Sequence, residues 1–174
     1  MQKLSVKKIL LPALAAVVVL AAVLVLLLPR VQPQGEKQVS TKDAAAITLS
    51  EDGSAVVINT EQVGPTASFF AYEVDGVTVE LFAVAAADGT VRLALNTCQV
   101  CNGSPYAYFV QQKDGFVCQN CRNYFSTLQV GLVSGGCNPV PITEEYYSVE
   151  DKNICIHTEF LTVNAVRFKN WKTF

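Results

Sequence analysis

The sequence predicts a mainly β fold with little helix, in one small domain that follows a single N-terminal transmembrane helix. Three observations lead to this prediction: an uncharged apolar run near the N-terminus, short β-branched and aromatic runs separated by Asp-Gly pairs, and two C-x-x-C motifs. About 140 residues follow the apolar run, which is an ordinary size for one domain.

The first thirty residues differ in composition from the rest of the chain. Three lysines precede an apolar run, Ile9–Leu28, that carries no charged side chain. A helix of roughly 20 apolar residues is long enough to cross a bilayer core. A secretory signal has a shorter apolar region that ends near small residues, whereas this run ends in Leu-Leu-Leu-Pro-Arg. The pattern therefore favours an uncleaved anchor over a cleaved signal.

The charges around the apolar run predict its orientation. Basic residues favour the cytoplasmic side of a span, and Arg30 is the only one that follows directly. We expect residues 1–30 to be a cytoplasmic N-terminus and a single-pass anchor in the cell membrane. Residues 31–53 are expected to form a flexible stalk and residues 54–174 an extracytoplasmic domain. Fifteen acidic residues and nine Lys or Arg follow position 30, a formal charge of −6, so nucleic acid is not an expected partner.

Strand and turn signals dominate residues 54–174. An Asp-Gly pair between two β-branched runs is the strongest short-range signal for a hairpin. Such pairs predict hairpins that turn at Asp75-Gly76, Asp88-Gly89 and Asp114-Gly115. Further strands are expected over residues 55–58, 153–158 and 160–168, and short helical turns over residues 125–132 and 143–147.

Two C-x-x-C pairs are the most specific feature of the chain. Sixteen residues separate Cys98 and Cys101 from Cys118 and Cys121. Each pair can form a tight turn, and the hairpin between them can bring both turns together, so that four thiolates surround a metal. The spacing is that of a zinc ribbon and of neither common ferredoxin, which favours zinc. Structural disulfides and thiol–disulfide chemistry are the alternatives, because disulfides persist outside the cytoplasm.

A further cysteine motif follows the two pairs. In Gly135-Gly136-Cys137-Asn138-Pro139, the glycines and the proline set a thiol in a rigid loop. Cys137 is either a fifth sulfur near the metal or part of a second site, or else a thiol buried in a loop or a disulfide partner of Cys155. Cys155 and His157 lie two residues apart in an expected strand and so share a face, but a lone histidine in such a place is usually structural.

The order of these motifs resembles a known family. The runs DGTVRLALNTCQVC, GSPYAY, FVCQNCRNYF and GGCNPVPI follow one another between residues 88 and 142, and FFAYEVDGVTVELFAV precedes them. Together they are similar to the FtrD-like membrane iron–sulfur-containing proteins. The resemblance implies a cysteine-bound iron–sulfur cluster or iron outside the membrane, held by the motif cysteines Cys98, Cys101, Cys118, Cys121 and Cys137. It also implies a part in iron uptake, with a membrane permease or a redox partner.

The expected function is that of a membrane-anchored extracytoplasmic metalloprotein that serves iron or metal uptake or electron transfer. Tyr106, Tyr108 and Phe125 are expected to pack around the centre and limit its access to water, or to form the core of the hairpin. The alternatives are a structural zinc ribbon in a partner-binding module and an extracytoplasmic thiol oxidoreductase. No catalytic constellation points to an ordinary enzyme, because the chain has one histidine and no Gly-rich phosphate loop after a strand.

We expect the Ile9–Leu28 segment to remain in the mature protein, because it is long enough to span a bilayer and lacks an adjacent cleavage pattern. N-terminal sequencing of the protein isolated from membranes measures this, and it should find the original N-terminus. A mature chain that starts near residue 30 would contradict the expectation.

Overall fold

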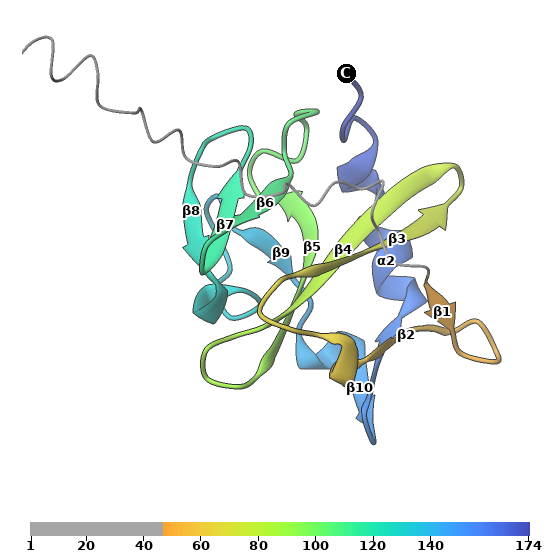
Figure 1. Cartoon of the computed structure of the whole chain (residues 1–174). Coiled ribbons are helices and arrows are strands. Elements are labelled where there is room, and N and C mark those ends of the chain that lie inside the picture. The colour runs from red at the N-terminus through yellow and green to blue at the C-terminus, as the bar shows by residue number, and fades with distance from the viewer. Residues whose placement is uncertain (1–46) are drawn as a thin grey trace, which may run out of the picture. The chain divides into compact units, whose positions relative to one another are not determined.

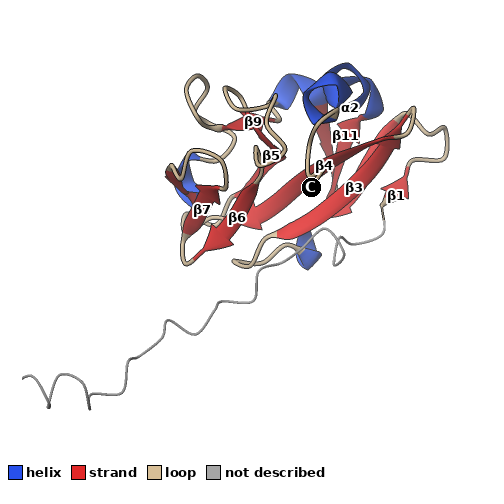
Figure 2. Cartoon of the chain, turned by 90° about the horizontal axis from the view of Figure 1, so that it is seen from above, coloured by secondary structure: helices blue, strands red, loops and turns tan. Residues whose placement is uncertain are grey.

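The structure, a computed structural model, describes residues 47–174. These residues form three antiparallel sheets and one short α-helix near the C-terminus (Figures 1 and 2). The expectation of a mainly β fold with little helix is confirmed. The expected anchor and residues 31–46 of the expected stalk lie outside the described residues. Within residues 47–174, no helix is long and apolar enough to cross a membrane.

The central sheet has the strand order β3-β4-β5-β9. Its strands are β3 (Ser68–Val74), β4 (Val77–Ala85), β5 (Val91–Cys98) and β9 (Pro139–Pro141). Asp75 and Gly76 both have positive φ, 48° and 78°, as a two-residue type I′ turn requires. The two hairpins predicted in this sheet, β3–β4 and β4–β5, are confirmed. Strand β9 contains two prolines and lies at the edge of the sheet. There, the N–H that proline lacks removes no hydrogen bond between inner strands.

A second sheet has the order β1-β2-β11-β10. Its strands are β1 (Thr48–Leu49), β2 (Ala55–Asn59), β10 (Tyr147–Glu150) and β11 (Asn153–His157). Strand β1 falls inside the range 31–53 expected to be a stalk. The chain then forms α2 (Thr158–Asn164) and the 3₁₀ helix η5 (Ala165–Phe168). The expectation of a strand over 160–168 is wrong, because its buried residues recur at helical spacing: Phe160, Leu161, Ala165 and Phe168.

The third sheet is small and has the order β6-β7-β8. Its strands are β6 (Phe109–Gln112), β7 (Gly115–Cys118) and β8 (Tyr124–Ser126). The β6–β7 hairpin confirms the third predicted turn. Three short 3₁₀ helices connect the strands: η2 (Thr60–Gln62), η3 (Thr127–Gln129) and η4 (Glu144–Tyr146). The turn expected over 143–147 is therefore present, whereas the range 125–132 is helical only in η3, because its first residues pair with β7.

The central sheet is buried on both faces. Figures 1 and 2 show β6 and β7 on one side of it and α2 on the other. Alternate residues of β4 and β5, such as Leu81 and Leu95, face a main core shared with β2, β11 and α2. The residues between them, such as Phe82 and Cys98, face a second core shared with the third sheet. The cysteine at the end of β5 therefore points toward the small sheet.

We expect Gly115→Ala to destabilise the small sheet. A Cβ at Gly115 would meet the carbonyl oxygen of Phe125 and the ring of Tyr124 well inside van der Waals contact. Overpacking of this kind lowers the free energy of unfolding by about 1–3 kcal/mol. Thermal unfolding followed by circular dichroism measures the change. Gly103→Ala is the matched control, since a Cβ there meets no atom within 4 Å, and equal losses in both variants would contradict this account of the packing.

Candidate metal centre

Two strand ends carry the first cysteine of each C-x-x-C pair. Cys98 is the last residue of β5 and Cys118 the last residue of β7. The short segment before β6 joins them: the Cys98 N–H donates to the Ala107 carbonyl (3.1 Å) and the Gln119 N–H to that of Tyr108 (2.8 Å). Phe109 then pairs with Cys118 in the ladder. The hairpin therefore folds back so that both cysteine turns lie against one segment of chain, as the sequence predicted.

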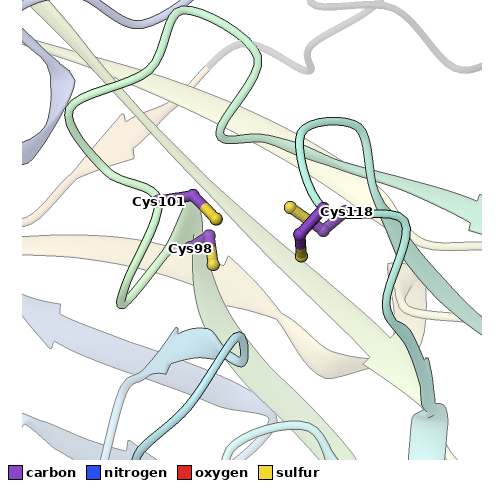
Figure 3. A group of neighbouring side chains, drawn as sticks. Cys98, Cys101 and Cys118 are labelled. Atoms are coloured by element: carbon purple, nitrogen blue, oxygen red, sulfur yellow. The ribbon is translucent and has the colours of Figure 1, made fainter.

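The sulfur atoms of the four paired cysteines converge. The four Sγ atoms all lie within 4.8 Å of one another, and Figure 3 shows Cys98 and Cys101 on one side of the shared space and Cys118 on the other. Cys98 and Cys118 are buried, whereas Cys101 and Cys121 are partly exposed. All six cysteines of the chain belong to the described residues, and none of them forms a disulfide.

The two turns present main-chain donors to the inner sulfurs in the same way. The N–H groups of Val100 and Cys101 bond to the Cys98 sulfur, and those of Asn120 and Cys121 to the Cys118 sulfur. Such donors offset thiolate charge. In the second turn the residue after Cys121, Arg122, has a left-handed backbone with φ of 64°. The Arg122 N–H donates to the Cys118 carbonyl (2.9 Å) and closes the turn.

Hydrogen bonds among the thiols shift the pKa values of three of them. The hydrogen bond between the two inner thiols lowers the pKa of Cys118 to about 5 and raises that of Cys98 well above its ordinary range. Burial raises the pKa of Cys121 to about 12, and its contacts with Cys118 and Cys137 act in the same direction. In the absence of a metal, ionisation of Cys118 is therefore favoured while Cys98 and Cys121 keep their protons.

Cys137 lies beside the four-sulfur group but outside it. Its sulfur contacts that of Cys121, and its side chain packs against the second core. Gln99 holds the loop that contains Cys137 in place. Its Oε1 accepts from the Gly135 N–H (2.9 Å) and its Nε2 donates to the Pro139 carbonyl (3.0 Å). The structure places Cys137 next to one sulfur of the group, and its role as a metal ligand stays a prediction.

Of the aromatic residues expected around the centre, only Phe125 packs against the core that contains the paired cysteines. Tyr108 packs against the main core instead, and Tyr106 stacks on Phe174 with ring centroids 5.1 Å apart. Cys155 and His157 belong to β11 in the second sheet, and neither is in the four-sulfur group. A disulfide between Cys155 and Cys137 is not present.

A buried polar network supports the cysteine turns, and sequence reasoning missed it. Asn96, two residues before Cys98, accepts from the Phe109 N–H at Oδ1 (2.7 Å) and donates from Nδ2 to Glu80 (2.5 Å). Burial raises the pKa of Glu80, while Lys172, 3.5 Å away, opposes the shift. The signal in the sequence is a carboxylate, Glu80, and an amide, Asn96, each placed among the apolar residues of a strand, β4 and β5.

The second connection between the turns is on the surface. The Ser104 hydroxyl, three residues after the first cysteine pair, donates to Oδ1 of Asn120 (2.8 Å), which lies between the cysteines of the second pair. This hydrogen bond joins the two loops directly. The resulting arrangement offers four sulfur ligands in a group, which suits tetrahedral zinc or iron.

A family model described as membrane iron–sulfur-containing protein, FtrD-like, matches residues 64–168, which is more than half of the chain. The match covers all four sulfurs of the group and Cys137. No curated protein and no solved structure shows a significant similarity to the chain.

We expect Asn96→Ala to weaken both the fold and metal retention. The substitution leaves the buried Phe109 N–H without its acceptor and removes a donor from Glu80, at about 1–3 kcal/mol for each unsatisfied group. Thermal unfolding and metal content after dialysis measure the two effects.

The control for this variant is Thr97→Val, one residue along the same strand. Thr97 is fully buried, and its hydroxyl has no hydrogen-bond partner among the described residues, so a nearly isosteric valine should leave both quantities unchanged or raise stability. An Asn96→Ala protein as stable as the Thr97→Val protein would contradict the role given to this network.

Proposed function

The chain belongs to the FtrD-like family of membrane iron–sulfur-containing proteins, and on this premise we propose that it is an anchored electron-transfer protein of a metal-uptake system. In this proposal residues 1–30 hold the protein in the cell membrane with the N-terminus in the cytoplasm, and the β domain works outside. The convergence of four cysteine sulfurs within 4.8 Å is the observation that carries the proposal.

The donor set suits a one-electron metal. Thiolates are soft ligands that bind iron as well as zinc, and a thiolate-bound iron would supply the one-electron chemistry. Main-chain N–H groups that bond to the sulfurs tune the potential of such centres. The inner sulfurs of both turns receive these bonds, from Val100 and Cys101 in the first turn and from the equivalent positions of the second.

The centre also lies close to the surface of the domain. Cys101 and Cys121 are partly exposed, and Val100 between the first two cysteines is 65% exposed. Electrons can therefore reach the outer sulfurs over a short distance, while the inner sulfurs stay in the second core with Phe82 and Phe116. The partner in this proposal is a membrane permease or a redox protein of the same uptake system, which the anchor brings to the same bilayer.

A structural zinc site is the second candidate. The C-x-x-C spacing favours it, and the packing of Cys98 and Cys118 in the second core means that a bound ion would cross-link β5 to the small sheet. A zinc ion there would stabilise the fold and carry no electron.

We expect the full-length protein, purified anaerobically in detergent, to contain iron and to show a reversible change in visible absorption on reduction and reoxidation. Cys118→Ser should lose metal and absorption, because it removes a sulfur that contacts Cys98 across the centre. A spectroscopic redox titration measures both.

Cys155→Ser is the matched control, since it makes the same chemical change at a buried cysteine of the second sheet, outside the four-sulfur group. It should keep the metal and the redox change. A colourless wild type that holds only zinc and shows no redox change would contradict electron transfer and favour the structural site.

A further inference from the structure

The spread of the four sulfurs limits what can lie between them. One tetrahedral ion with metal–sulfur bonds of about 2.3 Å places its ligand sulfurs about 3.8 Å apart, and two ligands of one ion can never lie more than about 4.6 Å apart. The four Sγ atoms here lie within 4.8 Å of one another. Shifts of a few tenths of an ångström, well within side-chain freedom, would bring them to the geometry of one ion.

An iron–sulfur cluster makes a different demand on its ligands. Its cysteines bind to two or more irons, and the thiolates point outward from a core that also contains sulfide. Two cysteine sulfurs that bind different irons of a cluster therefore lie farther apart than two sulfurs that bind one ion, because the distance between the irons adds to the two metal–sulfur bonds. The contact between Cys98 and Cys118, which belong to opposite turns, leaves no room for such a core. The four sulfurs do not fit a cluster.

We infer that the centre binds a single metal ion through Cys98, Cys101, Cys118 and Cys121, and that it is not an iron–sulfur cluster. The inference rests on the proposed metal-binding function and departs from the iron–sulfur group that the family description names. The matching N–H donors of the two turns agree with it, because each turn then supplies two of the four ligands of one ion in the same way.

The inference also gives Cys137 a role. Four thiolates complete the tetrahedral coordination of one ion, so a fifth sulfur has no coordination position to fill. Cys137 contacts Cys121, the partly exposed ligand of the second turn. Cys137 therefore lies beside the ligand Cys121 without binding the ion, in a loop that Gln99 fixes.

The test is the composition of the full-length protein, purified anaerobically in detergent: metal per chain and acid-labile sulfide per chain. We expect one metal ion and no labile sulfide. Two or more irons per chain together with labile sulfide would overturn the inference, while leaving electron transfer possible. One zinc ion without sulfide would support the inference and overturn the electron-transfer proposal, so the two failures are distinct.

Protein that loses its metal during purification is tested by anaerobic titration with Co²⁺. The thiolate-to-cobalt absorption should reach its end point at one equivalent, and a larger end point or no binding would overturn the inference. Cys137→Ser should give the same end point as the wild type, whereas Cys121→Ser should weaken Co²⁺ binding at least tenfold. Equal losses in the two variants would make Cys137 a ligand and contradict a four-thiolate site.

Discussion

Mutual repulsion of thiolates is the constraint on which this structure depends. Four cysteine sulfurs occupy a space less than 5 Å across, and they cannot all be ionised there without a cation. When no metal is bound, the hydrogen bond from Cys98 lowers the pKa of Cys118 to about 5, while the pKa values of Cys98 and Cys121 are raised. A metal ion would displace the thiol protons, so its affinity falls as the pH falls.

The fold satisfies the constraint by folding a hairpin over a sheet that is buried on both faces. One face of β4 and β5 packs against the main core, and the other receives the small sheet (Figure 2). The segment Ala107–Phe109 bonds to both cysteine turns and to Asn96. A shift of the small sheet relative to β5 would therefore separate the sulfurs. The packing of the second core thus holds the metal ligands together as well as stabilising the fold.

The local features were predictable from the sequence, because they depend on residues close together in the chain. Asp75-Gly76 encodes its turn through the backbone conformations that the pair accepts, and the two cysteine pairs converge because a single hairpin joins them. Residues 160–168 were misassigned, since a short apolar run fits a strand or a buried helix equally well. The contacts of Gln99 with Gly135, and of Asn96 with Glu80, join distant residues by polar side chains, and no local pattern encodes them.

The inferred centre has four cysteine sulfurs that bind one metal ion. X-ray absorption at the edge of the bound metal tests it most directly, because it measures the ligands and their distances without regard to function. The account predicts four sulfur neighbours at about 2.3 Å and no metal neighbour beyond them. A metal–metal distance in the spectrum, or nitrogen and oxygen ligands in place of sulfur, would contradict it.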